Sequence, residues 1–291
     1  MPSEGPTAAP QMRLIAAGLG WSVSEFLCRA GPADPRVEER HDGFSIAAVV
    51  EGSFTYRTNG GEALLHPGAL LLGNHARCFA CGHDHSRGDR CISFNFAPDY
   101  FAEIAASAAG SSRYAFPAVM APADKASTPI LVAAEVVGGE AQPLRLAETA
   151  TRLAETVIAG VSGHVAARAP VSALEHRRIA EALRHIEDHA ADPLDLDALA
   201  SVARLSKYHF LRVFRRAIGM TPYQFVLNIR MRRAAVRLAR SSETILSIAF
   251  DAGFGDLSTF NNRFRGIFGM SPSAYRERGL ERRALKYPGT A

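Results

Sequence analysis

The sequence has no long apolar run, few cysteines and no basic N-terminal stretch followed by an apolar core. No apolar segment reaches the roughly 18 residues that a membrane-spanning helix needs. The first residues are rich in Pro, Ala and Gly, which is unlike a secretory signal. We therefore expect a cytoplasmic protein with no membrane partner. Because cytoplasmic thiols stay reduced, we expect the cysteines as core residues, metal ligands or redox sensors rather than as disulfides; they are Cys28, Cys78, Cys81 and Cys91.

Acidic and basic residues are distributed unevenly along the 291 residues. Residues 171–291 contain 20 Lys and Arg against 12 Asp and Glu, whereas residues 1–170 contain 13 against 17. The length favours two domains, so we expect an acidic domain followed by a basic one that binds a polyanion. An ordinary solvated basic surface is the simpler alternative.

Short apolar runs separated by turn signals fill the first part of the chain. The runs occupy residues 44–50, 53–57, 63–66, 69–72 and 91–96. Asn59-Gly60-Gly61 predicts a hairpin turn, because its residues tolerate positive φ. Strict alternation in 91–96 predicts one face that packs and another that lines a cavity. Many short strands of this kind predict a β sandwich or barrel.

Helical spacing replaces the strand pattern after residue 98. We expect helices near residues 129–137 and 143–160. The second carries a broad apolar stripe, which is either a dimer seam or a face packed on its own domain. Residues 162–172 lack an apolar face and include Pro170, which favours a linker.

The basic part contains an internal repeat. FRRAIGMTP at residues 214–222 returns 50 residues later as FRGIFGMSP at residues 264–272, and Phe210 and Phe260 share that offset. A repeat of this kind predicts two copies of one structural unit.

Each copy of the repeat follows a short amphipathic stretch, at residues 196–204 and 245–252. A turn and a helix N-cap come next, with Ser206 in the first copy and Asp256 in the second. Gly253 stands where the second turn must reverse sharply, and glycine has free access to positive φ. Each copy therefore predicts a helix-turn-helix unit.

The second helix of such a unit enters the major groove with its outward side chains at base edges. The candidate DNA contacts on these outward positions are Lys207, Tyr208, Leu211, Arg212, Arg215, Ser258, Thr259, Asn261, Asn262 and Arg265. A helical bundle that arose by duplication, with merely solvated arginines, is the alternative.

Residues 175–278 resemble the DNA-binding domain of the AraC/XylS family of bacterial transcription regulators. The resemblance is carried by IAFDAGFGDLSTF at 248–260, Phe264-Arg265, FGMSP at 268–272 and Tyr275-Arg276. It implies seven helices, in which a long helix at 222–239 joins two recognition helices that enter successive major grooves. It also implies a bipartite double-stranded DNA operator with half-contacts about 34 Å apart, a homodimer, and contact with RNA polymerase.

Two positions depart from the family pattern. Asn262 stands where many members carry Arg, and Leu211 where some carry a polar residue, so base-edge hydrogen bonding differs here. Five arginines are candidate phosphate contacts, although each could instead bridge carboxylates. They are Arg215, Arg230, Arg232, Arg233 and Arg265.

Residues 26–96 resemble the cupin-like β barrel that precedes this DNA-binding domain in many family members, where an effector binds inside the barrel. The resemblance rests on the strand rhythm and on the turns at residues 51–53 and 66–68. The expected fold class is therefore α+β multidomain, with a cupin-like β barrel flanked by helices and an all-α domain with two helix-turn-helix units. The expected divisions are residues 1–12 (disordered), 13–161 (sensor and dimerisation), 162–172 (linker), 173–280 (DNA binding) and 281–291 (tail).

The segment 75–91 packs three Cys and three His into seventeen positions. Thiolates and imidazoles at this spacing suit a zinc-like transition metal, and the candidate metal or redox residues are Cys78, Cys81, His83, His85 and Cys91. A single Cys-x-x-Cys lacks the second pair of a zinc ribbon. Small core cysteines with surface histidines, or a redox sensor with a low-pKa thiolate, are the alternatives.

These patterns favour a DNA-binding regulator, expected to be an activator, whose operator binding responds to a signal at the β domain. The signal is a metal ion or thiol oxidation at residues 78–91, or otherwise a small organic effector. A DNA-linked enzyme is the alternative, either a cysteine alkyl acceptor or a metal-dependent cupin catalyst. The sequence shows no nucleophile with an adjacent base, so we do not expect an enzyme.

Overall fold

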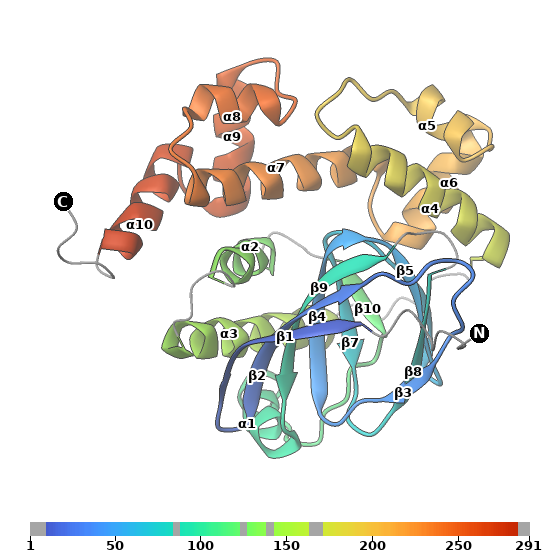
Figure 1. Cartoon of the computed structure of the whole chain (residues 1–291), viewed down its shortest axis with the longest axis vertical. Coiled ribbons are helices and arrows are strands. Elements are labelled where there is room, and N and C mark those ends of the chain that lie inside the picture. Colours follow the sequence, from blue (N-terminus) through green and yellow to red (C-terminus); the bar gives the residue numbers. More distant parts are fainter. Residues whose placement is uncertain (1–9, 84–87, 123–126, 138–142, 163–170, 285–291) are drawn as a thin grey trace, which may run out of the picture.

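The structure, a computed structural model, describes residues 10–83, 88–122, 127–137, 143–162 and 171–284. An antiparallel β domain with helices on its outside precedes an all-α domain, and one long helix of the latter lies across the β domain (Figure 1). This arrangement confirms the predicted α+β fold class. No helix within the described ranges is both long and apolar enough to cross a membrane.

The described strands form two antiparallel sheets. Their bounds are β1 (Gln11–Gly18), β2 (Trp21–Cys28), β3 (Glu38–Arg40), β4 (Phe44–Gly52), β5 (Phe54–Thr58), β6 (Gly61–Leu65), β7 (Ala69–Gly73), β8 (Cys78–Gly82), β9 (Asp89–Phe96) and β10 (Met120–Pro122). One sheet has the order β1-β2-β9-β4-β7-β10 and the other the order β3-β8-β5-β6. Thr58 pairs with Gly61 across the turn between β5 and β6, as the predicted hairpin requires.

The alternation of β9 places its side chains in two separate cores. Ile92, Phe94 and Phe96 pack with the helices that cover the six-stranded sheet. Cys91 faces the other way and packs with Val49 and other residues of both sheets. The predicted packing face is therefore confirmed, and the opposite face looks into the space between the sheets.

Three described helices belong to the β domain: α1 (Pro98–Ala109), α2 (Ser127–Val137) and α3 (Pro143–Ser162). The apolar stripe of α3 is buried in the domain's own core, with Leu146, Leu153 and Ile158 each 0% exposed. The stripe is therefore no dimer seam, because its side chains are already covered. Leu144 is apolar but 74% exposed, because it lies at the start of the helix.

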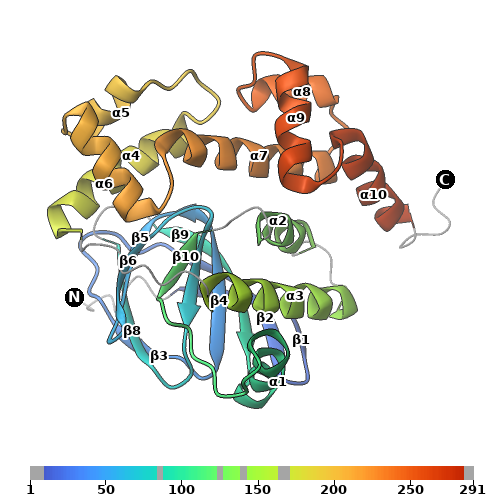
Figure 2. The ribbon, with the colours of Figure 1, turned by 180° about the vertical axis from the view of Figure 1, so that it is seen from behind.

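The all-α domain contains the seven helices that the family resemblance implies, all within residues 171–284. They are α4 (Ala173–Asp188), α5 (Leu196–Val202), α6 (Lys207–Ile218), α7 (Pro222–Arg240), α8 (Ile245–Asp251), α9 (Leu257–Phe268) and α10 (Pro272–Ala284). Helix α7 begins with Pro222 after the capping residue Thr221 and joins the two repeat copies. Figure 2 shows α6 and α9 on the same side of α7.

The predicted divisions of the chain are only partly within the described residues. Of the expected disordered start, residues 1–9 lie outside them, but Gln11 and Met12 belong to β1 because they pair with Leu27 and Phe26. Most of the expected linker, residues 163–170, also lies outside them. The expected tail begins too early, because α10 continues to Ala284.

Candidate nucleic-acid interface

Both predicted N-caps hold the start of a recognition helix. The Ser206 side chain accepts a hydrogen bond from the amide of His209 at 3.4 Å at the start of α6. The Asp256 carboxylate accepts one from the amide of Thr259 at 2.7 Å at the start of α9. These bonds satisfy amides that a helix leaves free at its N-terminus, so they fix where each recognition helix begins.

The turns before the two recognition helices use positive φ at corresponding places. Arg204 has φ 51° in the first turn and Gly253 has φ 85° in the second. A Cβ atom at Gly253 would lie 2.5 Å from the carbonyl oxygen of Ala191, a distance too short for any side chain. The predicted role of Gly253 is confirmed, and close approach adds a second reason for glycine.

A separate aromatic core supports each recognition helix. Phe210 and Phe214 of α6 are 0% exposed and pack with α4, α5 and α7. Phe260 and Phe264 of α9 are also 0% exposed and pack with α7 and α8. Because α7 contributes to both cores, it sets the orientation of the two helices relative to each other.

Most of the predicted DNA contacts are exposed on the recognition helices. The exposed residues are Lys207, Tyr208, Arg212, Arg215, Ser258, Thr259, Asn262 and Arg265. Leu211 and Asn261 are half-buried. Tyr208 is 83% exposed, which a large aromatic side chain does not need for folding. Both recognition helices begin at the end that points away from the β domain (Figure 2).

Known proteins resemble the all-α part of the chain. A family model described as a helix-turn-helix domain matches residues 199–278. The regulatory protein SoxS of Salmonella typhimurium is 33% identical over 106 residues, which are 36% of this chain and 99% of that relative. The chain belongs to the AraC family of DNA-binding transcription regulators. The matched region is the DNA-binding part of this family.

Other relatives of this AraC-family chain are longer than the matched region. An uncharacterized HTH-type transcriptional regulator of Haemophilus influenzae is 32% identical over 105 residues, so the match spans 35% of that relative and 36% of this chain. Among solved structures, the DNA-binding domain of AdpA in complex with a target DNA is 30% identical with a TM-score of 0.35. That match covers 36% of this chain and 96% of the AdpA domain.

The guanidinium of Arg230, one of the predicted phosphate contacts, is bound to the protein backbone. It donates hydrogen bonds to the carbonyl oxygens of Ala190 at 2.6 Å, Asp192 at 2.9 Å and Gly253 at 2.6 Å. These carbonyls lie after α4 and in the second turn. Arg230 therefore ties the two helix-turn-helix units together through α7.

Arg232 is wrong as a phosphate contact, because it is buried against the β domain. Its guanidinium lies 3.6 Å from the carboxylate of Glu135 in α2, and the two side chains are only 8% and 13% exposed. Arg233 is exposed but donates to the carbonyl oxygen of Glu187 at 2.9 Å. The candidates that keep an exposed position on recognition helices are Arg215 and Arg265.

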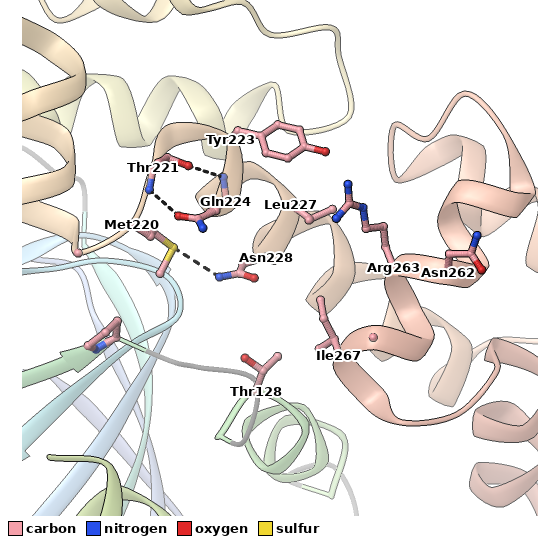
Figure 3. A pocket seen from close by; sticks show the side chains of 13 residues that line it. Thr128, Met220, Thr221, Tyr223, Gln224, Leu227, Asn228, Asn262, Arg263 and Ile267 are labelled. Atoms are coloured by element: carbon pink, nitrogen blue, oxygen red, sulfur yellow. Dashed lines mark hydrogen bonds between the residues drawn. The ribbon is translucent and has the colours of Figure 1, made fainter. Parts of the chain in front are cut away.

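A cavity that no sequence pattern predicted lies between the two units and the β domain. The cavity has a volume of about 710 Å³ (Figure 3). Tyr223 and Gln224 of α7, Asn262 and Arg263 of α9, and Thr128 of α2 contribute to its lining. Asn262 therefore faces this cavity as well as solvent.

The β domain reaches into both halves of the AraC-type domain. Leu64 of β6 belongs to the core of the first helix-turn-helix unit, and Val132 of α2 to that of the second. The main chain of Glu135 accepts a hydrogen bond from Arg240 at the end of α7. The Gly52 amide donates to the Glu187 carboxylate at 3.2 Å.

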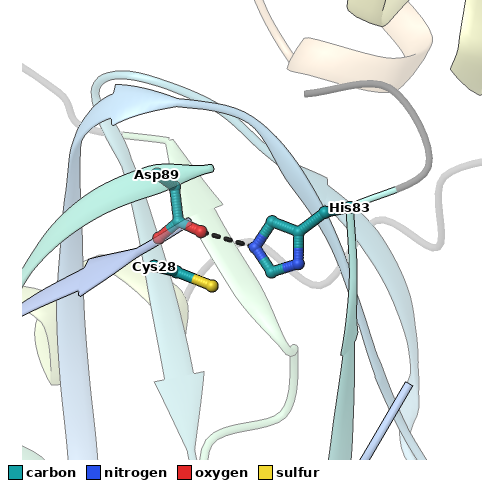
Figure 4. Close-up of side chains that lie close together, drawn as sticks. All are labelled: Cys28, His83 and Asp89. Atoms are coloured by element: carbon teal, nitrogen blue, oxygen red, sulfur yellow. Dashed lines mark hydrogen bonds and ion pairs between the residues drawn. The ribbon is translucent and has the colours of Figure 1, made fainter. Parts of the chain in front are cut away.

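The predicted cysteine and histidine cluster is only partly assembled. Cys78 and Cys81 are three positions apart on β8, so their side chains point to opposite faces of the sheet. His85 lies outside the described residues. His83 is instead grouped with Cys28 and Asp89, whose ligand atoms all lie within 4.8 Å of one another (Figure 4). Sequence reasoning missed these two partners because they come together only through strand pairing.

The chemistry of these groups follows from burial and hydrogen bonding. Burial lowers the pKa of His83, but hydrogen bonds to Asp89 and Cys28 outweigh it and raise this pKa to about 9. Burial raises the pKa of the Cys81 thiol and that of the Cys91 thiol. Thiols of this kind are poor redox sensors, because the thiolate is the reactive form.

Proposed function

We propose that this AraC-family chain activates transcription by binding a bipartite double-stranded DNA operator through α6 and α9. In this proposal the β domain changes operator affinity by changing how the two helix-turn-helix units are held. Operator affinity then depends on a signal at the β domain, and the two states of the chain bind that signal unequally.

The proposal depends on one observation, which is that α2 packs against α7. Glu135 holds Arg232 with its carboxylate and Arg240 with its main-chain oxygen, and both arginines belong to the helix that joins the two units. Since Leu64 and Val132 also pack into one unit each, a shift of the β domain moves the recognition helices relative to each other. The spacing of the operator half-contacts depends on that geometry.

The sequence leaves three kinds of signal open: a metal ion or thiol oxidation at residues 78–91, or otherwise a small organic effector. The raised pKa values of Cys81 and Cys91 disfavour oxidation, and the opposite faces of Cys78 and Cys81 disfavour a paired chelate. The proposal therefore keeps a metal ion held by other residues, or an organic effector.

Glu135→Gln tests the proposal, because the substitution keeps the side-chain shape and removes the charge that faces Arg232. Operator affinity and footprint are measured for the full chain at fixed salt, since phosphate contacts make affinity steeply salt dependent. The operator is a fragment that the wild type selects from a random DNA pool. We expect the affinity to change by at least about fivefold, the lower end of typical couplings between sites.

Glu103→Gln is the matched control, because Glu103 is exposed on α1, away from the interface. The control variant is expected to bind as the wild type does. Unchanged affinity in Glu135→Gln would overturn the modulating role of the β domain. If the wild type selects no DNA sequence, the proposal that the chain is a sequence-specific regulator is wrong.

The activating role, contact with RNA polymerase, the homodimer and the cytoplasmic location are further parts of the proposal, supported by the family resemblance. Transcription from a promoter carrying the selected operator, with purified polymerase, should rise when the chain is added. A fall would make the chain a repressor. Sedimentation of the free chain as a monomer at micromolar concentration would contradict the homodimer.

A further inference from the structure

Cys28, His83 and Asp89 form a group at one end of the β domain in which Cys28 is half-buried and the other two are buried. Cys28 ends β2, Asp89 begins β9 and His83 follows β8, so three separate strand ends bring them together (Figure 4). His83 and Asp89 are buried, with side chains 8% and 7% exposed. Phe54 stacks on the His83 ring with centroids 5.7 Å apart. An apolar neighbour therefore shields the His83 ring from water.

The three side chains are the donor types that a zinc-like cation prefers: one sulfur, one imidazole nitrogen and one carboxylate oxygen. A thiolate and a carboxylate together carry two negative charges, which balance a divalent cation and avoid an uncompensated buried charge. Three protein ligands leave a fourth position of a tetrahedral site open. The Cys91 thiol donates a hydrogen bond to the other Asp89 oxygen at 3.2 Å.

The simpler interpretation is a hydrogen-bonded pair, because His83 Nε2 and Asp89 Oδ2 lie 2.6 Å apart. Two ligands of one tetrahedral zinc ion lie about 3.3 Å apart, given bonds of about 2.0 Å. Coordination requires the His83 nitrogen and the Asp89 oxygen to move apart by roughly 0.7 Å. The hydrogen bond therefore does not exclude coordination, and an experiment separates the two.

Strand register connects this group to the DNA-binding domain. Cys28 and Gly52 are the partners of Asp89 on either side, in β2 and β4. The backbone segments approach each other closely here: a Cβ atom at Gly52 would lie 2.3 Å from the carbonyl oxygen of Gly88, and one at Gly88 would lie 2.1 Å from that of Cys28. The Gly52 amide in turn holds Glu187 of α4. Asp89 is thus linked to the domain interface through one strand pairing and one hydrogen bond.

We infer that Cys28, His83 and Asp89 bind one zinc-like divalent cation, and that this cation is the signal that changes operator affinity through Gly52 and Glu187. The regulatory half of this inference rests on the proposed function, whereas the binding half stands without it.

The binding half is tested with the full chain, reduced and treated with a chelator. Co²⁺ is added as a probe, because its bond to a thiolate produces a charge-transfer absorption, and Zn²⁺ is then used to displace it. We expect one ion per chain with the thiolate band. Cys28→Ser should lose the band and bind at least about tenfold more weakly, since even outer substitutions at metal sites cost 10- to 100-fold. Cys78→Ser, on the opposite face of β8 from Cys81, should bind as the wild type does.

The outcomes separate the two halves. No stoichiometric binding by the wild type, equal binding by Cys28→Ser, or loss of binding in Cys78→Ser each overturns the site. For the regulatory half, Zn²⁺ should change operator affinity of the wild type at fixed salt and leave that of Cys28→Ser unchanged. If Zn²⁺ binds without changing operator affinity while Glu135→Gln does change it, the site and the proposed function both stand and the link between them is wrong.

Discussion

The amide of Gly52 donates a hydrogen bond to the carboxylate of Glu187 at 3.2 Å and so joins the β domain to the first helix of the DNA-binding domain. Burial raises the pKa of Glu187 to about 7. The Gly52 amide and Arg233 oppose this shift, whereas Asp188 and Glu51 add to it. The contact between the two domains therefore includes a carboxyl group that changes its charge near neutral pH.

Glu187 is expected to make the stability of the chain pH dependent. Its pKa is higher in the folded chain than the value of about 4.3 in an unfolded chain, so the folded state binds more protons between these values. The contribution of Glu187 is fully present below pH of about 4.3 and is lost as the pH rises through about 7. Thermal unfolding midpoints are measured for the wild type and for Glu187→Gln across this pH range. The two midpoints should diverge as the pH rises, and the midpoint of the variant should be the higher one. Parallel curves would contradict the shift, and Glu103→Gln should follow the wild type.

Arg230→Ala is expected to lower the free energy of unfolding. The substitution removes the hydrogen bonds to the carbonyl oxygens of Ala190, Asp192 and Gly253. Bonds from a charged donor contribute about 1.5–3 kcal/mol each, but solvent and relaxation recover part of the loss, so we expect a net cost of about 3 kcal/mol. Urea denaturation measures it. Arg215→Ala, an exposed arginine on α6, should stay within about 0.5 kcal/mol of the wild type. Equal stability of the two variants would show that Arg230 is not the tie between the units.

Local sequence predicted the DNA-binding domain well, because its determinants lie close together along the chain. Ser206, Asp256 and Gly253 act within a few residues of their own turns. The roles of Arg230 and Arg232 could not be predicted in this way, because their partners lie about 40 residues away or in the other domain. An outward arginine on a helix looks the same in sequence whether it faces DNA, a carbonyl oxygen or a carboxylate.

The β domain shows the same limit more sharply. The many Cys and His residues in 75–91 predicted a metal or redox site at the end of the sheet where His83 and Asp89 lie. Their spacing could not predict that Cys28 pairs with Asp89 across β2 and β9. Strand register places those residues together, and register depends on the whole sheet. The predicted pair Cys78 and Cys81 fails for the opposite reason, because a regular strand separates residues three apart onto different faces.

Arg265→Ala is expected to weaken DNA binding equally for all sequences. Arg265 is exposed on α9. A side chain that contacts a phosphate does not read the base sequence, so its loss affects all sequences alike. The slope of log affinity against log salt should become shallower by about one unit. Filter binding at several salt concentrations measures the slope. Arg113→Ala removes an exposed arginine of the β domain and should leave the slope unchanged. An unchanged slope in Arg265→Ala would assign that arginine to the solvated surface.

Asn262→Ala, on the same helix as Arg265, is expected to change base preference and to leave the salt dependence of binding unchanged. Asn262 is exposed on α9, one turn before Arg265, and its amide can bond the edge of an adenine in the major groove. Its loss should relax preference at one operator position by about 1–3 kcal/mol, or roughly 5- to 150-fold, with no change in the salt slope. Affinities for the operator and for its single-base variants measure this. Because Asn262 also lines the cavity beside α7, uniform weakening across all variants would mean that it supports the helix and does not read a base.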